Sequence, residues 1–402
     1  MCWVPVSRLY GQEALTTAIQ QGEAYQGRSS QVGRLPHEMS IGPVQFSAGL
    51  SYTMQWNDNI YLVPSNLESD LILNPMLKIG ALWPATEESS MSFGMGIGYQ
   101  HYLDHSDLNR LNIVPDSELA WDIHADDFTF SLFDSVSYTQ DPISQGSLSG
   151  TASFPTVQNT AGLDVKWRPS RYSFTVGYAH FNLFSQSSQY DYLTRASEQF
   201  YGNAAYSFAD RTKTGIEASG SLTRYESGFR PNYQSISCGP FLNWQLIDSL
   251  SLTLRGGYVI YLNDPSTLNL GADNVTSYYI DFRATHQLTD FISHGLTVVR
   301  DVQPGDNRGN LFQEQFQASY FAAWAFHRNF SFTASFFYEL GSQPVLGIQD
   351  DYSRFGAGCG LTWQPLEKWN ARLGYNYTEK TDTFSIQNYQ QNVVSLGITY
   401  RF

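Results

Sequence analysis

Strict alternation of apolar and polar side chains is the feature that most constrains this chain. It is clearest in residues 391–402, the last dozen of the sequence. Because successive side chains of a β-strand point to opposite faces, this segment predicts a strand with one apolar face and one mostly polar face. The apolar face packs against a second sheet in a soluble sandwich, or against lipid in an outer-membrane barrel. That face consists of Val394, Leu396, Ile398, Tyr400 and Phe402.

The same alternation recurs through most of the chain and is interrupted by regularly spaced turn signals. From Pro84 to Glu367, short polar turns follow one another at intervals of roughly 40 residues, with two alternating runs between neighbouring turns. A propeller blade of that period would contain four short strands instead of two long ones. The pattern predicts an all-β, up-and-down antiparallel transmembrane barrel of about 18 strands, with 16 as the alternative. Short periplasmic turns would lie at one end and long extracellular loops at the other.

Composition excludes several other classes of protein. No run of about 18 apolar residues exists, so a helical membrane protein is excluded. The net charge of −14 argues against a nucleic-acid partner, which requires a basic surface. Cys238 and Cys359 lie on well-separated predicted strands, so a disulfide framework is not indicated.

The chain divides into two regions at about residue 43. Residues 1–43 lack the alternation, and residues 1–10 contain no apolar core long enough for a complete secretion signal. We therefore expect a periplasmic leader over residues 1–43, partly disordered or with a short helix over residues 13–25. Residues 44–402 would form the barrel in the bacterial outer membrane, and the export signal is missing or truncated in this sequence.

Charged side chains fall on the polar face of several predicted strands. In a barrel this face lines the lumen, where water accommodates charge without burying it unpaired. Asp134 falls instead on the apolar face of its strand, which indicates a register shift or a position near the loop rim. The candidate lumen-lining residues are Lys78, Asp164, Lys166, Glu217, Arg255, Asp281, Arg283, Arg354 and Arg372.

Two further features indicate a membrane setting. Six tryptophans lie near short turns on the apolar face, as expected for an interfacial aromatic girdle. The aromatic carboxy-terminal strand predicts an assembly signal formed by Ile398, Tyr400 and Phe402. The girdle consists of Trp83, Trp167, Trp244, Trp324, Trp363 and Trp369.

A short opening motif resembles a known family. The segment Trp56-Asn57-Asp58-Asn59-Ile60-Tyr61, followed by residues 69–75, is similar to the opening hairpin of the β-barrel porin type 2 family. The terminal Tyr400-Arg401-Phe402 is similar to the signal that outer-membrane barrels present to the barrel-assembly machinery. The resemblance covers residues 44–402 and implies an outer-membrane channel, without catalytic residues.

Other chemistry has weaker support in the sequence. His101, Asp104, His105 and Asp107 form a histidine–carboxylate cluster, but no second cluster completes a coordination sphere, and a polar strand end is the simpler interpretation. No G-x-S-x-G nucleophile elbow stands out. We therefore expect no metal, no cofactor and no enzymatic activity.

Three functional hypotheses remain open from the sequence. The first is a porin-like channel for passive diffusion of small hydrophilic solutes. The second is a barrel for polysaccharide export, and the third is a plugged barrel with a structural or adhesive role. Expected partners are outer-membrane lipid, the barrel-assembly machinery and small hydrophilic solutes, with the oligomeric state left open.

We predict that the six tryptophans form a belt at one membrane interface. Lipids brominated at different depths should quench their fluorescence most strongly at headgroup depth, because amphipathic indole rings prefer that position. Strongest quenching at the bilayer midplane, or no quenching, would contradict this prediction.

Overall fold

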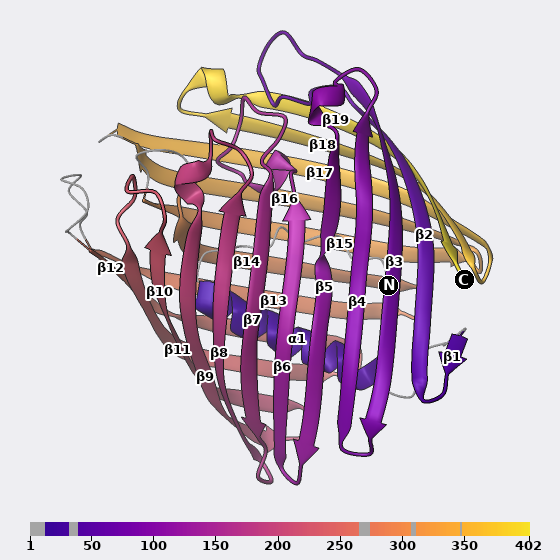
Figure 1. The fold of residues 1–402 in the computed structure, drawn as a ribbon, viewed down its shortest axis with the longest axis vertical. Helices are drawn as coiled ribbons and strands as arrows, with labels where there is room; N and C mark the ends of the chain where they lie inside the picture. The colour runs from indigo at the N-terminus through magenta and orange to yellow at the C-terminus, as the bar shows by residue number, and fades with distance from the viewer. Residues whose placement is uncertain (1–12, 32–38, 265–273, 307–310, 346–347) are drawn as a thin grey trace.

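Eighteen long strands form one closed antiparallel barrel in the computed structural model, which describes residues 13–31, 39–264, 274–306, 311–345 and 348–402 (Figure 1). Each strand pairs with the next in sequence. The last strand, β19 (Tyr389–Arg401), returns to pair with the first barrel strand, β2 (Val44–Asn57). The expected all-β barrel of 18 strands is therefore confirmed, and the 16-stranded alternative is wrong.

The strands of the first half contain between twelve and seventeen residues each. They are β2, β3 (Asp70–Thr86), β4 (Ser89–Tyr102), β5 (Arg110–Ala125), β6 (Phe128–Thr139), β7 (Thr156–Trp167), β8 (Tyr172–Ser185), β9 (Arg195–Ala209) and β10 (Thr212–Tyr225). The second half consists of β11 (Tyr233–Ile247), β12 (Leu250–Asn263), β13 (Val275–Thr289), β14 (Ile292–Pro304), β15 (Phe312–His327), β16 (Phe330–Val345), β17 (Ile348–Leu366), β18 (Trp369–Asp382) and β19.

Short turns join the strands at one end of the barrel, which we call the short-turn rim. Asp126 and Ser170 adopt left-handed φ values of 50° and 55° in two of these turns. The turn expected at Pro84 lies slightly later in the chain, because β3 continues to Thr86 through a register shift. Proline has no N–H to donate to the ladder, and a bulge is one of the few strand positions that tolerate it.

The two faces of the wall differ as the alternation predicts. Bulky apolar side chains are exposed on the outer wall, while the inner wall is mostly polar or glycine. Inner-face glycines make room for aromatic rings: the ring of Tyr201 lies against Gly177, and that of Phe337 against Gly356, where a Cβ atom would collide with the ring. These glycines therefore allow the lumen to hold large side chains close to its wall.

The amino-terminal segment contributes a helix and a short strand. The helix α1 (Glu13–Gln31) lies inside the barrel and contacts β8, β9 and β10 (Figure 1). It begins where expected, but it extends beyond residue 25, and its contacts are with the lumen wall. The three-residue strand β1 (Met39–Ile41) pairs with residues 44–46 of β2, in line with β19. Among the described residues, no helix has the length and apolar character needed to cross a membrane.

The carboxy-terminus takes part in closing the barrel. The Phe402 backbone N–H donates to the Ala48 carbonyl at 3.0 Å, and the Phe402 ring lies edge-on to Tyr400, with the ring centres 5.1 Å apart. Phe402 therefore lies beside the seam between β19 and β2.

Deleting Phe402 should lower the yield of folded, heat-modifiable barrel in outer membranes, because the terminal aromatic residue is the expected assembly signal. The matched control is Phe326→Ala, which removes an exposed aromatic ring from the outer wall at the same rim, away from the seam. Normal yield and rate of assembly for the truncated protein would contradict the prediction.

Candidate functional site

The lumen is the candidate functional site, and α1 occupies it. At the start of the helix, Arg195 on β9 donates to Glu13 Oε1 from Nη2 at 2.7 Å and from Nε at 2.9 Å. Both side chains are more than nine-tenths buried. Removing one partner of such a pair leaves an uncompensated buried charge, at a cost of about 3–5 kcal/mol. This pair therefore fixes the first turn of α1 to the wall.

Near the end of the helix, Arg28 bridges two carboxylates of β5. Its guanidinium contacts Glu118 and donates from Nε to Asp122 Oδ2 at 2.9 Å. Ser131 on β6 also donates to Asp122, at 2.6 Å. The planar fork of arginine suits this double contact, so a lysine at residue 28 would not replace it.

A third ion pair reaches another part of the wall. Glu23 accepts from Arg283 Nη1 on β13 at 2.8 Å, in a half-exposed pair. The Lys166 ammonium on β7 lies 3.9 Å from the centre of the Tyr25 ring, a cation–π contact. Because its contacts lie on β5, β7, β9 and β13, α1 braces widely separated parts of the barrel.

The predicted lumen-lining residues lie on the inner wall, and the structure brings several of them together. Asp281 accepts from Arg283 Nε at 3.0 Å, Arg255 contacts Glu217, and Lys78 lies 3.3 Å from Asp116. Tyrosines bond to two of the predicted lumen-lining carboxylates: Tyr201 donates to Asp164 at 2.5 Å, and Tyr279 donates to Glu217 at 3.1 Å. Arg372 lies on the inner face of β18, beside Gly360, and apart from these pairs.

Arg354 has a different setting from the others because it lies beneath a loop. It is nearly fully buried, donates to Glu339 at 2.7 Å and donates to the Ile143 carbonyl at 2.6 Å. Lys380 Nζ likewise donates to the Ser147 carbonyl at 3.0 Å. Residues 140–155 join β6 to β7, so these bonds tie that loop to strands on another side of the lumen.

The inward loop packs with neighbouring loops into a layer across the long-loop end. Ser147 donates to Asp306 at 2.7 Å, and Tyr192 donates to the Asp306 carbonyl at 2.5 Å. Burial raises the pKa of the Asp306 carboxyl, which favours its protonated form. A cluster of buried apolar side chains completes the layer: Leu148, Phe154, Phe181, Leu183, Tyr190, Tyr192 and Leu193.

The sequence predicts that inward-folding loops narrow the lumen, and it leaves open whether a loop or the amino-terminal segment plugs it; the positions of the two obstructions were not predicted. The apolar residues Leu148 and Phe154, within a segment expected to be an exposed loop, were the available signal for an inward fold. The signal in α1 was its spacing of Glu13, Thr17 and Gln21 on one helical face, which matches polar partners on the wall.

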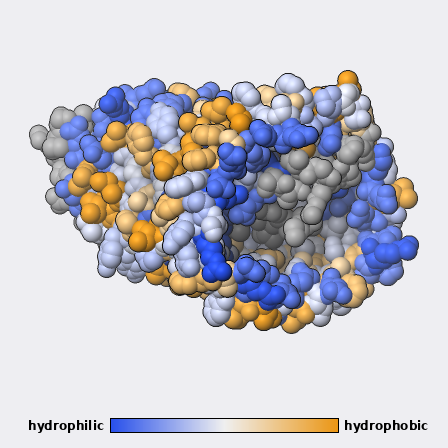
Figure 2. Space-filling view, turned by 90° about the horizontal axis from the view of Figure 1, so that it is seen from below, coloured by the Kyte–Doolittle hydropathy of each residue, from blue (hydrophilic) through white to orange (hydrophobic). Residues whose placement is uncertain are grey.

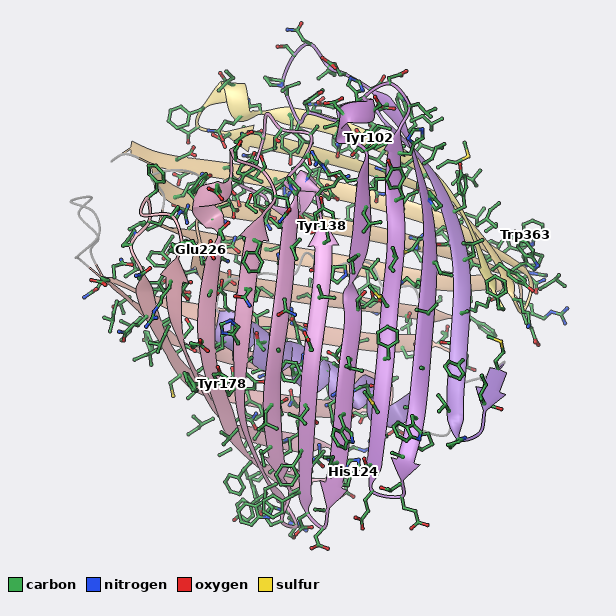
Figure 3. The ribbon with its side chains drawn as sticks, in the orientation of Figure 1. Tyr102, His124, Tyr138, Tyr178, Glu226 and Trp363 are labelled. Atoms are coloured by element: carbon green, nitrogen blue, oxygen red, sulfur yellow. The ribbon has the colours of Figure 1, made fainter. Side chains whose placement is uncertain are left out.

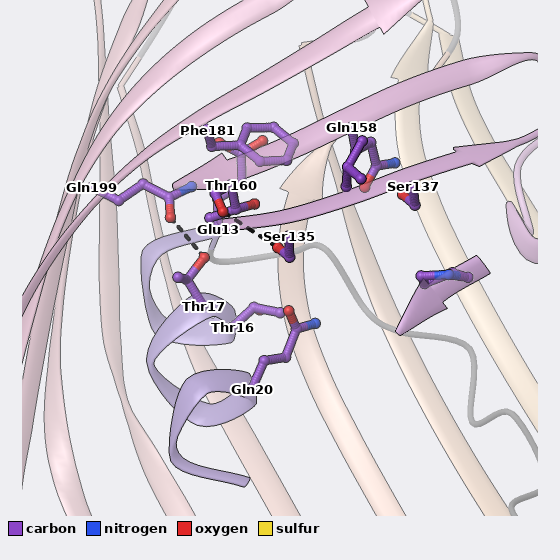
Figure 4. A pocket seen from close by; sticks show the side chains of 12 residues that line it. Glu13, Thr16, Thr17, Gln20, Ser135, Ser137, Gln158, Thr160, Phe181 and Gln199 are labelled. Atoms are coloured by element: carbon purple, nitrogen blue, oxygen red, sulfur yellow. Dashed lines mark hydrogen bonds between the residues drawn. The ribbon is translucent and has the colours of Figure 1, made fainter. Parts of the chain in front are cut away.

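A small polar cavity lies between α1 and the wall of β6–β9 (Figure 4). Its volume is about 50 Å³, and Glu13 is the one ionisable residue among the described residues that line it. Thr17 Oγ1 donates to Gln199 Oε1 at 2.6 Å across this cavity. Within the part of the chain that the structure describes, Gln199 Nε2 and Glu13 Oε2 have no hydrogen-bond partner. The lining residues are Glu13, Thr16, Thr17, Gln20, Pro115, Ser135, Val136, Ser137, Gln158, Thr160, Phe181 and Gln199.

The six predicted girdle tryptophans are exposed on the outer wall near the short-turn rim, as Figure 3 shows for Trp363.

Asp134 also lies on the outer wall, where it accepts from Asn159 Nδ2 at 2.6 Å. Elsewhere on the outer wall, Tyr178 of β8 donates to Glu198 of β9 at 2.6 Å. Asp134 therefore keeps the unshifted register, and a neighbouring strand supplies its hydrogen bond. Viewed from below, the molecule is hollowed, with hydrophilic residues along much of the edge (Figure 2).

His105 joins two loops at the opposite, long-loop rim. Its Nδ1 lies 2.8 Å from Asp70 Oδ2, and its Nε2 lies 2.7 Å from Glu68 Oε2. These bonds, the one to Asp70 foremost, raise the pKa of the His105 imidazole. The histidine–carboxylate cluster considered from the sequence thus pairs His105 with different carboxylates. Among the described residues, no group of three or more histidine, cysteine or acidic side chains is arranged to hold a metal ion.

Comparisons with known proteins support the fold. No family model matches the chain, and no curated protein matches it. Among solved structures, Pseudomonas aeruginosa OpdK with vanillate is similar with a TM-score of 0.52 and 12% identity, over 89% of this chain and 99% of that one. Pseudomonas aeruginosa OccK2 (OpdF) in complex with glucuronate is similar with a TM-score of 0.53 and 11% identity, over 90% of this chain and 99% of that one. Acinetobacter baumannii OccAB4 is similar with a TM-score of 0.51 and 10% identity, over 91% of this chain and 100% of that one. At such identities the likeness establishes the shared barrel fold alone.

We predict that the His105 contact weakens as pH rises. A raised pKa means that the folded loops bind the proton more tightly than the unfolded chain does, so the stabilisation is complete below the ordinary pKa of about 6.5. This stabilisation is lost as pH rises through the raised pKa of His105. Hydrogen exchange of residues 58–69, corrected for intrinsic rates, should accelerate in the wild type as pH rises from about 6.5 through the raised pKa of His105. His105→Gln should remove most of this dependence, and an unchanged dependence in that variant would contradict the assignment.

Proposed function

We propose that this protein is an outer-membrane channel for small hydrophilic solutes, with α1 as a plug that must move before solutes pass. The observation that carries the proposal is the contrast between an apolar, aromatic outer wall and a charged, polar lumen wall that grips a polar helix. A packed soluble core does not contain so many charges, whereas a lumen in contact with water does.

The similar solved structures add support from the same fold. OpdK was solved with vanillate and OccK2 with glucuronate, so barrels of this architecture bind small solutes. The opening motif that resembles the β-barrel porin type 2 family favours the same class of function. In this proposal the short-turn rim faces the periplasm, the long loops face the exterior, and the barrel-assembly machinery reads the carboxy-terminal strand.

Two obstructions would control passage. The layer of loops narrows the long-loop end, and α1 lies in the lumen against β8, β9 and β10. The charged contacts of α1 are few and separate, so the helix can leave without unfolding any strand. The mechanism we propose is therefore diffusion past a polar wall, gated by release of α1.

The test compares conductance of the purified protein with that of the double variant Glu13→Gln, Arg28→Gln in planar bilayers. The variant loses the buried pairs at both ends of α1, so its open probability should rise by about tenfold or more, given the cost of an unpaired buried charge. Arg211→Gln, which breaks an exposed pair with Asp248 at the short-turn rim, is the matched control and should behave as wild type.

Two results would count against the proposal. Equal, high conductance of wild type and double variant would mean that α1 does not block the lumen. A double variant that is folded by heat-modifiability but silent in the bilayer would favour the plugged structural or adhesive barrel.

A further inference from the structure

One part of the lumen wall is built from uncharged hydrogen-bonding groups. On β6, β7, β9 and β10, between the charged groups near the short-turn rim and the loop layer, the inner face carries hydroxyls and amides. Some of these hydroxyls bond to each other, as Ser197 does with Thr223 at 3.0 Å and Ser219 with Ser237 at 2.7 Å. The groups on this uncharged wall include Ser135, Ser137, Gln158, Thr160, Ser197, Gln199, Ser219 and Ser221.

Gln199 is the member of this wall with an incomplete set of bonds. Its side chain is 0% exposed, its Oε1 accepts the Thr17 hydroxyl at 2.6 Å, and its Nε2 lacks a partner among the described residues. A buried amide nitrogen without a partner costs roughly 1–3 kcal/mol, so such a group requires an explanation. Gln199 lines the cavity beside α1, where Figure 4 shows its side chain meeting that of Thr17.

The chemistry of the missing partner follows from the amide. A primary amide places a carbonyl acceptor beside an NH₂ donor group, and two neighbouring hydroxyl groups of a polyol can bond to both. The Thr17 hydroxyl already supplies the first half of that pattern.

We propose that the wall around Gln199 is a binding subsite for uncharged polyhydroxylated solutes, such as sugars, and that Thr17 of α1 occupies one hydroxyl position of that subsite. The Phe181 ring, which also lines the cavity, supplies an apolar surface for the C–H face of such a solute. The wall residues that the structure describes around this position are all uncharged, which favours an uncharged solute.

The size of the cavity couples the solute to α1. About 50 Å³ admits only one or two water-sized groups, since a water occupies about 30 Å³ in the liquid. A whole sugar therefore binds only as Thr17 leaves, and its binding favours release of the helix. This inference rests on the proposed channel function, because it assigns a solute class to the plugged lumen.

The experiment measures binding without measuring permeation. The full chain is placed in lipid nanodiscs free of sugar-based detergent, and sucrose binding is titrated by saturation-transfer NMR. Thr17→Val removes the competing hydroxyl at constant shape, so the dissociation constant should fall by about threefold or more. Gln199→Met removes the amide, so the dissociation constant should rise by about tenfold or more. Gln315→Met, on the wall formed by β15, is the matched control and should leave it unchanged.

Tetraethylene glycol, which lacks neighbouring hydroxyls, and glucuronate, which adds a charge, define the solute class. Opposite effects of the Thr17 and Gln199 variants support the subsite, because misfolding would weaken binding in both. The inference is overturned if sucrose does not bind saturably even to Thr17→Val, which would leave the cavity to water. It is also overturned if Thr17→Val fails to tighten binding, or if either comparison solute binds as well as sucrose. A protein that binds sucrose but never conducts would overturn the channel instead.

Discussion

Closure of the sheet is the constraint on which the rest of this structure depends. Once β19 pairs with β2, every strand has two neighbours, and each side chain has only two destinations, the outer wall or the lumen. The alternation of apolar and polar residues in the sequence follows from these two destinations, because apolar side chains occupy the outer wall and polar side chains the lumen. Because polar side chains point into the lumen, charged side chains of opposite sign lie close together there and form ion pairs. The ion pairs between Arg255 and Glu217 and between Arg283 and Asp281 follow from this crowding.

The helix extends the same principle. Glu13 and Arg28 of α1 supply charges opposite to those of Arg195, Glu118 and Asp122 on the wall and pair with them. The plug and the wall are thus electrostatic complements. The half-exposed pair of Arg283 with Glu23 adds little by itself, because solvent screens it, whereas the buried pairs at the two ends of α1 determine whether it stays.

Barrel, strand number and the two faces could be predicted because period-two alternation is a local property, legible in stretches as short as residues 369–378. The displaced turn at Pro84 shows the limit of local rules, since ladder pairing carries β3 to Thr86. The positions of α1 and of residues 140–155 could not be predicted, because they depend on contacts such as Glu13 with Arg195 and Ile143 with Arg354, whose members lie far apart in sequence. The spacing of Glu13, Thr17 and Gln21 marks a polar helical face, but that spacing alone does not tell whether the face meets solvent or a lumen wall.

The strand β1 gives α1 a limited range of movement. It holds the chain at residues 39–41 against β2, so α1 is attached to the seam by about eight peptide steps, which span at most about 30 Å when fully extended. A helix of 19 residues is itself about 28 Å long. In the proposed gating, this link sets an upper limit on how far α1 can move while residues 39–41 stay paired with β2. Its return is an intramolecular event, governed by a local concentration in the millimolar range typical of short linkers, independent of how much protein the membrane contains.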